Sequence, residues 1–240
     1  MAVAREDGLN PLRKILGGEA AIDQKRMSRT MPQRYQRGNQ RKIRGMPISA
    51  IYNVRGGTLA QYDRIIAALG EHANSPGGIA HIAAATPDGI LVCDIWESQE
   101  ALDNFARHLG PLAEAAGIGS QNSPLMGRVE NMTITENDND MPAVAILYSI
   151  PGMSVARYRE LLSQVKFEGS PSTARRAHIA CETAEGMFIV ALWESEAAFR
   201  AFEPAINAAF AATGVNGASP VIGQIHRAGF MPGAFQSVRA

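Results

Sequence analysis

Short apolar runs alternate along residues 48–228 with segments in which apolar residues recur every three or four positions. The short runs are rich in β-branched residues and end at Gly or Pro, which is typical of strands, whereas the 3–4 spacing is typical of amphipathic helices. The expected strands are 49–54, 78–85, 89–96, 126–135, 144–150, 176–183, 187–193 and 221–228, and the expected helices place their apolar residues within 59–69, 102–116, 155–165 and 199–209. The pattern therefore predicts strand-helix-strand-strand-helix-strand, twice.

Residues that begin helices precede these segments. Thr58 is followed three positions later by Gln61, the spacing of a capping box, in which each side chain bonds the other residue's backbone. Ser98 and Ser195 each precede an acidic first turn, where a hydroxyl caps free N–H groups and a carboxylate stabilises the positive end of the helix dipole. We therefore expect helices to begin directly after these three capping positions.

Prolines and glycines predict turns and breaks. Residues 86–89, Thr-Pro-Asp-Gly, have the composition of a hairpin turn. Pro111 and Pro204 fall inside two expected helices, and because proline lacks an N–H and its ring clashes with the preceding turn, we expect each to kink or interrupt its helix.

The two halves of the pattern match each other. Residues 48–131 align with 144–227 at an offset of 96 or 97, in collinear order and with single-residue gaps, so the chain contains two copies of one unit. The equivalent pairs include Tyr52 with Tyr148, Tyr62 with Tyr158, His81-Ile82-Ala83 with His178-Ile179-Ala180, and Trp96-Glu97-Ser98 with Trp193-Glu194-Ser195. The expected parts are a basic N-terminal arm (1–46), repeat one (47–131), a linker (132–143), repeat two (144–228) and a C-terminal tail (229–240).

The order β-α-β-β-α-β is that of a ferredoxin-like unit, with two helices on one face of a four-stranded antiparallel sheet. The strand expected at 89–96 is apolar on both faces, which requires a second layer opposite the helices. Two units in one chain supply that layer to each other. We therefore predict an α+β protein in which two tandem ferredoxin-like repeats pack their sheets face to face as an α+β barrel.

These shared residues resemble the dimeric α+β barrel superfamily, and most closely its antibiotic biosynthesis monooxygenase-like branch. The resemblance rests on the strand-one tyrosine, the His-Ile-Ala strand and the Trp-Glu-Ser segment that leads into a helix, and it covers about residues 47–228. It implies a cofactor-independent monooxygenase or cyclase that acts on a small aromatic or polyketide-like molecule. Since most members pair single units, a fused pair permits a further homodimer but does not require one.

Some members of this superfamily degrade haem, and the resemblance gives that branch a histidine on the second helix and an asparagine on strand one. His108 stands on the second helix of repeat one, but its counterpart in repeat two is Ala205. Asn53 stands on strand one, but its counterpart is Ser149. This pattern is broken, so we expect neither haem nor any other cofactor.

His81 and His178 are the first candidates for catalysis because both repeats contain them. A histidine that faces a cavity could act as a base toward a phenol; it could equally be a structural residue whose nitrogens bond neighbouring groups. Asp94 shares a strand face with Trp96 and is replaced by Ala191 in repeat two. A buried Asp94 beside His81 would form an acid–base pair in repeat one alone, whereas a solvated carboxylate would have no such role.

The candidates for ligand binding surround these positions. Tyr52 and Tyr148 could bond a ligand oxygen or only fill the barrel, and Trp96 and Trp193 could line a site or anchor each strand to its helix. Asn53 and Arg55, at the end of strand one, could meet an anionic ligand or remain solvated. We expect no metal site, and Cys93 and Cys181 should be small buried residues.

Composition narrows the alternatives. The 240 residues are 46% apolar and 19% charged, without an apolar run long enough to span a membrane, and two cysteines are compatible with a reducing cytosol, so we expect a cytoplasmic protein. The arm over 1–46 carries eleven basic and four acidic residues, a net +7 that the rest of the chain balances with −7. It could contact an acidic partner or the protein's own body, or remain solvated, and translation could instead start at Met27, Met31 or Met46.

Known sequence motifs are absent from the chain. It has no phosphate-binding glycine loop, zinc-protease HExxH or serine-hydrolase GxSxG, and it has no specific nucleic-acid motif. A small apolar or aromatic molecule is therefore the expected partner of an enzyme. The alternative is a non-catalytic small-molecule-binding or scaffold protein whose arm docks a partner.

Overall fold

The described part of the chain forms a closed barrel of antiparallel strands with helices outside it. The computed structural model describes residues 46–118, 123–134, 142–165, 174–216 and 218–230. Repeat one contains β1 (Ile48–Arg55), α2 (Leu59–Leu69), the short 3₁₀ helix η3 (Gly70–Asn74), β2 (Gly78–Thr86), β3 (Gly89–Trp96), α3 (Gln99–Ala115) and β4 (Leu125–Ile134). Repeat two contains β5 (Val144–Pro151), α4 (Val155–Gln164), β6 (Arg175–Thr183), β7 (Gly186–Trp193), α5 (Glu196–Ala212) and β8 (Val221–Phe230).

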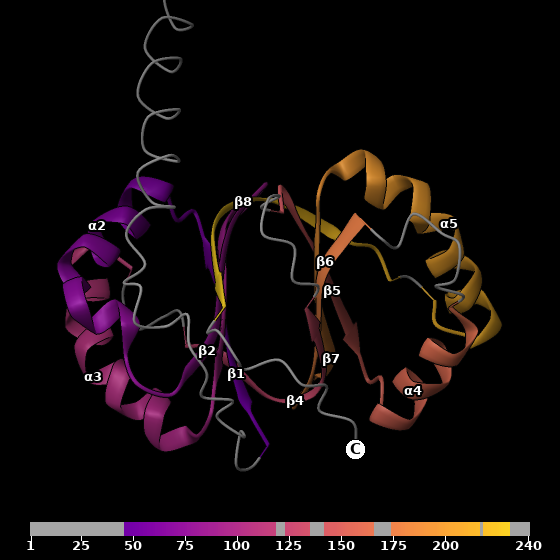
Figure 1. The fold of residues 1–240 in the computed structure, drawn as a ribbon, viewed down its shortest axis with the longest axis horizontal. Helices are drawn as coiled ribbons and strands as arrows, with labels where there is room; N and C mark the ends of the chain where they lie inside the picture. The colour runs from indigo at the N-terminus through magenta and orange to yellow at the C-terminus, as the bar shows by residue number, and fades with distance from the viewer. Residues whose placement is uncertain (1–45, 119–122, 135–141, 166–173, 217, 231–240) are drawn as a thin grey trace, which may run out of the picture. The chain divides into compact units, whose positions relative to one another are not determined.

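The two four-stranded sheets join at both edges. The strand order around the barrel is β1-β3-β2-β8-β5-β7-β6-β4, so β2 pairs with β8 and β6 pairs with β4 across the repeats. Figure 1 shows α2 and α3 outside the sheet of repeat one, and α4 and α5 outside that of repeat two. The predicted α+β class and antiparallel tandem barrel are confirmed.

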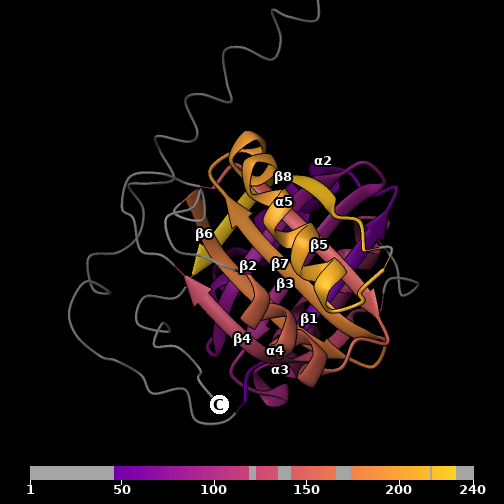
Figure 2. The same cartoon turned by 90° about the vertical axis from the view of Figure 1, so that its right-hand side faces the viewer.

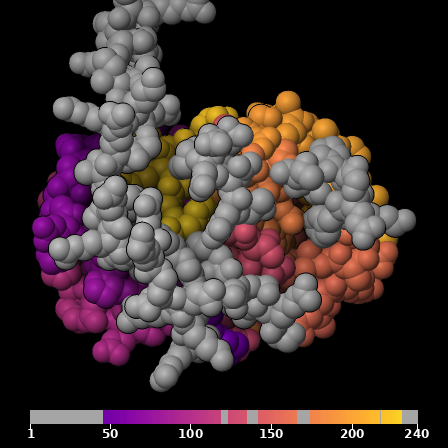
Figure 3. Space-filling model, viewed as in Figure 1, coloured from indigo at the N-terminus to yellow at the C-terminus, as the bar shows by residue number. Residues whose placement is uncertain are grey.

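The last strand of each repeat is shared between the two sheets. The start of β4 pairs with β1 of its own repeat, and the segment from Gly127 to Ile134 pairs with β6. β8 likewise pairs with β5 and then with β2, and in the space-filling view its yellow surface lies between the two repeats (Figure 3). This exchange places side chains of each repeat beside the helices of the other.

The barrel interior is a packed apolar core built by both repeats. The strand faces that point inward supply it, because side chains alternate between the two faces of a strand. Its fully buried members include Ile82, Cys93 and Ile95 from repeat one and Ile179, Cys181, Val190 and Leu192 from repeat two. Both cysteines are free and buried, as expected. The barrel centre is thus filled with side chains, and a ligand site must be sought between a sheet and its helices.

The helix signals in the sequence act as predicted, with one exception. The Thr58 hydroxyl accepts from the Gln61 backbone N–H at 3.3 Å while Gln61 Oε1 accepts from the Thr58 N–H at 2.9 Å, which completes the capping box. Ser98 and Ser195 cap α3 and α5. The exception is Pro111 and Pro204, since α3 and α5 continue through them.

Neither proline interrupts its helix, and a kink at each proline stays a prediction. Proline removes one backbone hydrogen bond, to the carbonyl four residues earlier. Those carbonyls belong to Arg107 and Arg200, whose residues are exposed, so water can satisfy them. Apolar residues on both sides of each proline then hold the helix against the sheet, Phe105 and the half-buried Leu112 in α3 and Phe202 and Phe210 in α5.

Two ion pairs join the repeats at equivalent places with opposite charge order. His226 of β8 contacts Asp63 of α2, with Nε2 and Oδ1 2.7 Å apart. At the equivalent place Glu130 of β4 contacts Arg159 of α4, with the shorter nitrogen–oxygen distance 2.6 Å. The base lies on the strand in the first pair and on the helix in the second. In each pair, a side chain of the last strand thus contacts a side chain of opposite acid or base character on the neighbouring helix.

Several expected parts lie outside the described residues. These are the arm over residues 1–45, most of the expected linker (135–141) and the end of the C-terminal tail (231–240). β4 continues to Ile134, into the segment expected to be a linker. In the part of the chain that the structure describes, the helices are too short or too polar to cross a membrane.

Candidate functional site

In repeat one, three side chains form a hydrogen-bonded chain between the sheet and α2. His81 on β2 lies directly across from Asp94 on β3, and its Nδ1 is 2.6 Å from Asp94 Oδ1. Its Nε2 is 2.7 Å from the hydroxyl of Tyr62, which α2 supplies. The carboxylate accepts from the Nδ1–H of the ring, and in the neutral ring Nε2 then accepts from the tyrosine hydroxyl. The acid–base pair that a buried Asp94 would form with His81 is present.

Repeat two keeps the tyrosine and the histidine but not the acid. The Tyr158 hydroxyl of α4 is 2.7 Å from His178 Nε2, and Asn131 Nδ2 donates to the same hydroxyl oxygen at 3.1 Å. Asn131 belongs to β4, so repeat one contributes to this cluster. The residue across from His178 on β7 is Ala191. The carboxylate of repeat one therefore has no counterpart on this strand.

Burial controls the protonation of the repeat-two cluster. It raises the pKa of the Tyr158 hydroxyl, which stays protonated. Burial, and then the positive charge of Arg175, lower the pKa of His178 to about 3, so the imidazole is neutral at physiological pH. Since Tyr158 accepts from Asn131, its own proton points to His178 Nε2, and the histidine proton lies on Nδ1.

A cavity of about 60 Å³ adjoins this cluster between the sheet and helices of repeat two. Its walls are mostly aromatic and aliphatic side chains of α4, α5, β5 and β7, and Figure 2 shows both helices lying across these strands. Tyr158, His178 and Ala191 line it, and among the described residues that do so the only charged side chain is that of Arg175. This lining suits a small molecule that is largely apolar.

Two buried donors on the cavity wall lack partners. The Tyr148 hydroxyl and the Trp193 Nε1–H have no hydrogen-bond partner among the described residues, although the two residues are only 4% and 1% exposed. Both line the cavity. An unsatisfied buried polar group costs roughly 1–3 kcal/mol. A ligand with acceptor oxygens would satisfy both donors.

The other predicted site residues fall into two groups. Tyr52 and Trp96 lie on the helix-facing side of repeat one's sheet, as do their counterparts in repeat two. Burial and the charge of Asp94 raise the pKa of Tyr52 to about 12. Asn53 and Arg55 alternate with Tyr52, so they lie on the opposite side of β1 and are exposed. The structure does not bring these two together with the histidine clusters.

Two histidines stand apart from these clusters. His108 is exposed on α3 and stacks on His72 of η3, with ring centroids 3.9 Å apart. It is not part of either histidine–tyrosine cluster. Among the described residues no group of three or more His, Cys, Asp or Glu side chains has the arrangement of a metal site.

Sequence reasoning missed the tyrosine partners of the histidines. Tyr62 and Tyr158 are buried on the apolar faces of their helices, and each also bonds its histidine. A signal was available, because the repeat preserves both tyrosines along with both histidines. Asn131 gave no such signal, since its position near Tyr158 depends on the exchange of β4 between the sheets.

Solved structures share this architecture at low sequence identity. A candidate monooxygenase from Fusobacterium nucleatum subsp. nucleatum matches with a TM-score of 0.57 and 10% identity over 78% of this chain and 95% of its own. A candidate monooxygenase from Lactobacillus acidophilus matches with a TM-score of 0.56 and 11% identity, over 78% of this chain and 97% of its own. A candidate chlorite dismutase matches with a TM-score of 0.51 and 8% identity, over 77% of this chain and 96% of its own. No family model and no curated protein matches the sequence.

These likenesses concern the fold. The described part of the chain shares its fold with these solved structures, which agrees with the α+β barrel predicted from the sequence. In this chain the two units of the barrel are consecutive segments of one polypeptide.

Proposed function

We propose that this chain is a cofactor-independent monooxygenase or cyclase that acts on a small aromatic molecule in the cavity of repeat two. The observation that supports this most directly is an apolar cavity with the unpartnered donors of Tyr148 and Trp193 on its wall. Aromatic walls stack with a planar substrate, and fixed donors hold its oxygen in one orientation. The two candidate monooxygenases that share the fold support the same class of reaction.

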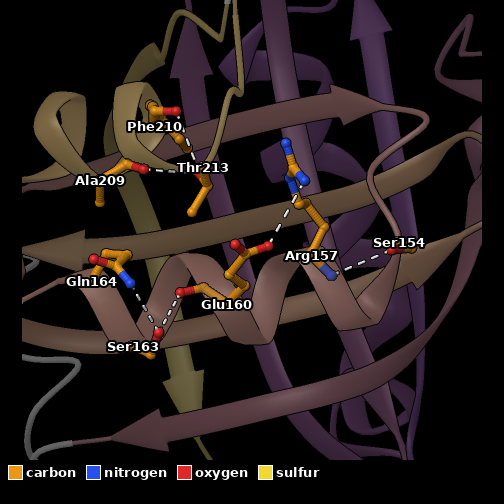
Figure 4. A network of polar contacts seen from close by, with 8 residues as sticks. All are labelled: Ser154, Arg157, Glu160, Ser163, Gln164, Ala209, Phe210 and Thr213. Carbon is orange, nitrogen blue, oxygen red and sulfur yellow. Dashed lines mark hydrogen bonds and ion pairs between the residues drawn. The ribbon is translucent and has the colours of Figure 1, made fainter.

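The cavity must enlarge to hold an aromatic ring. Its volume is about 60 Å³, whereas an engineered cavity that takes up benzene has about 150 Å³. Leu161, Leu162 and Val165 form the wall at the end of α4, and aliphatic side chains can change rotamer. Figure 4 shows Ser154, Arg157, Glu160, Ser163 and Gln164 bonded within α4 and its cap. Those contacts survive a small shift of the whole helix.

The proposed chemistry follows from what these donors do to a phenol. Hydrogen bonds from Tyr148 and Trp193 stabilise the phenolate more than the phenol, so binding lowers the pKa of the substrate, and its proton leaves to water. The electron-rich anion, shielded from water by aromatic walls, then reacts with dioxygen. A ring C–H becomes a carbonyl: 1-naphthol and O₂ give 1,4-naphthoquinone and water. The substrate supplies all the electrons, and His178 holds the anion without accepting its proton.

An oxygen electrode tests this proposal with 1-naphthol as the probe. We expect the full chain to consume one O₂ per naphthoquinone formed, and ¹⁸O₂ to place one labelled atom in the quinone. Tyr148→Phe should reduce kcat/KM about 10- to 150-fold, because one hydrogen bond to a developing charge is worth roughly 1.5–3 kcal/mol. Absence of turnover with a panel of naphthols and hydroquinones that do bind the cavity would contradict the proposal.

The second candidate is a non-catalytic protein that binds the same kind of molecule. The pKa of His178, lowered to about 3 by burial, supports it, because the imidazole is then a weak base. Saturable binding of naphthol to the cavity without oxygen consumption would favour this candidate.

A further inference from the structure

The two histidines present the same edge to different surroundings. Each ring lies stacked with its tyrosine, with centroids 6.0 Å apart for His81 and 6.2 Å for His178, and each Nε2 lies 2.7 Å from the tyrosine hydroxyl. The two rings therefore have the same orientation. His81 Nδ1 meets the residue across the strand pair, and with Nε2 held in the same way we expect His178 Nδ1 to face the equivalent residue, Ala191.

That place holds a carboxylate in repeat one and borders a cavity in repeat two. Asp94 fills it in repeat one, 2.6 Å from His81 Nδ1. Ala191 stands there in repeat two, and both Ala191 and His178 line the cavity. The methyl group of Ala191 is smaller than the side chain of Asp94. Repeat two therefore has space where repeat one has the Asp94 carboxylate.

The groups around this room favour a negative charge. His178 carries its proton on Nδ1, because Nε2 accepts from Tyr158. The hydroxyl of Tyr148 and the Nε1–H of Trp193 are unpartnered donors of lining residues. Among the described lining residues there is no carboxylate that could accept from these two donors. A desolvated anion needs hydrogen-bond donors around it, and these side chains supply them.

We propose that the repeat-two cavity binds a small aromatic oxyanion, a carboxylate or a phenolate, whose oxygen occupies the place that the Asp94 carboxylate holds in repeat one. In repeat one the histidine is paired with the carboxylate of Asp94. In repeat two the oxyanion of the ligand would pair with the histidine in its place. The inference names the substrate class of the proposed function and rests on that function for its site.

Benzoate and benzamide test the proposal because they have nearly the same shape and differ in charge. Isothermal titration calorimetry of the full chain at pH 7 should give one benzoate bound per chain, at least tenfold tighter than benzamide. Ala191→Asp supplies the missing carboxylate, so it should pair with His178 and weaken benzoate binding at least 100-fold. Equal affinities for benzoate and benzamide would overturn the proposal.

A second pair of variants covers the case in which Ala191→Asp does not fold. Tyr148→Phe removes one donor, adds no bulk, and should weaken benzoate binding about five- to tenfold while changing benzamide binding less. Tyr52→Phe, the same change in repeat one, should leave benzoate affinity within twofold of the wild type. Equal losses in both variants, or no loss in Tyr148→Phe, would overturn the assignment of the anion to repeat two.

The outcomes separate this inference from the proposed function. Tight benzoate binding without oxidation of 1-naphthol would support the anion site and contradict the monooxygenase. Oxidation of 1-naphthol inhibited as well by benzamide as by benzoate would support the monooxygenase and overturn the anion site. The NMR signal of the His178 Nδ1 proton should shift downfield with benzoate and stay in place with benzamide, because a charged acceptor forms the stronger hydrogen bond.

Discussion

Repeat one and repeat two share their topology and differ in what lies between sheet and helices. In repeat two a single apolar cluster fills this layer and includes Trp193, Phe199 and Phe210. In repeat one the layer is divided into two smaller clusters, one around Trp96 and one around Tyr62. The same backbone thus supports a continuous aromatic layer on one side of the barrel and an interrupted one on the other.

One strand position accounts for much of this division. Val92, Asp94 and Trp96 follow one another on the helix-facing side of β3, so the carboxylate stands between the two clusters of repeat one. At the equivalent place on β7, Ala191 continues the apolar layer and leaves room. Asp94 fills space and bonds His81, whereas Ala191, which replaces it in repeat two, lines a cavity together with His178. One difference between the repeats thus separates a filled position from a cavity.

The largest expected effect concerns the aromatic layer of repeat two. Phe210 is 5% exposed and lines the cavity, and its counterpart in repeat one is Ala113. Phe210→Ala should lower the free energy of unfolding by about 3–5 kcal/mol, because the ring is lost and the cavity grows. Urea unfolding measures this, and the variant should admit 1-naphthoate more readily than the wild type. A loss below about 1 kcal/mol would mean that the helices close over the gap.

The next effect concerns the carboxylate of repeat one. Asp94→Ala removes the acceptor that His81 Nδ1 uses at 2.6 Å, and should cost about 1.5–3 kcal/mol of unfolding free energy. Asp94→Asn keeps an oxygen acceptor, so it should cost less. Benzoate binding and naphthol oxidation should stay unchanged in both variants, because we propose that both take place in repeat two. Loss of oxidation in a folded Asp94→Ala chain would move the active site to repeat one.

The histidine of repeat two should make stability depend on pH. Its pKa is about 3 in the folded chain and near 6.5 when unfolded, so below pH 6.5 the unfolded chain binds a proton that the folded chain does not. The stabilisation is complete above pH 6.5 and is lost as the pH falls toward 3. Between pH 7 and pH 5 this histidine should lower the unfolding free energy by about 2 kcal/mol.

Urea unfolding at both pH values checks this, with His178→Gln as the control. That variant should lack this part of the pH dependence. If the wild type and His178→Gln lose the same stability between pH 7 and pH 5, the histidine is not held neutral by burial.

The architecture was accessible from the sequence because its signals are local and occur twice. The strand 89–96 was predicted with the bounds that the structure gives, since the turn at 86–89 and the Trp96-Glu97-Ser98 segment limit it on both sides. The face of Asp94 followed from alternation along the strand. Neither Pro111 nor Pro204 interrupts its helix, because tertiary packing of the helix face outweighs the loss of one exposed backbone bond.

The candidate site was accessible only in part. His81, His178, Tyr148 and Trp193 were singled out because the repeat preserves them, and repetition does not say which atoms meet. The partnership of Asn131 with Tyr158 depends on the pairing of β4 with β6, which no local pattern encodes. The cavity depends on the volumes of side chains from four elements of repeat two together. Long-range register and packing are the information that a single sequence gives least directly.

The smallest expected effect concerns the charge order of the ion pairs between the repeats. The side chains of Glu130 and Arg159 are 17% and 58% exposed, and those of His226 and Asp63 are 30% and 58% exposed, so each pair should contribute only about 0.2–1 kcal/mol. Glu130→Gln should lower stability by that amount at neutral and at mildly acidic pH, and added salt should reduce the difference.

Asp63→Asn tests the other pair in the same way, because it keeps the shape of the side chain and removes its charge. It should lower the free energy of unfolding by about 0.2–1 kcal/mol, as Glu130→Gln does. Urea unfolding of the two variants at low and at high salt checks this. A loss in only one variant would mean that the two contacts between the repeats differ in kind and not only in charge order.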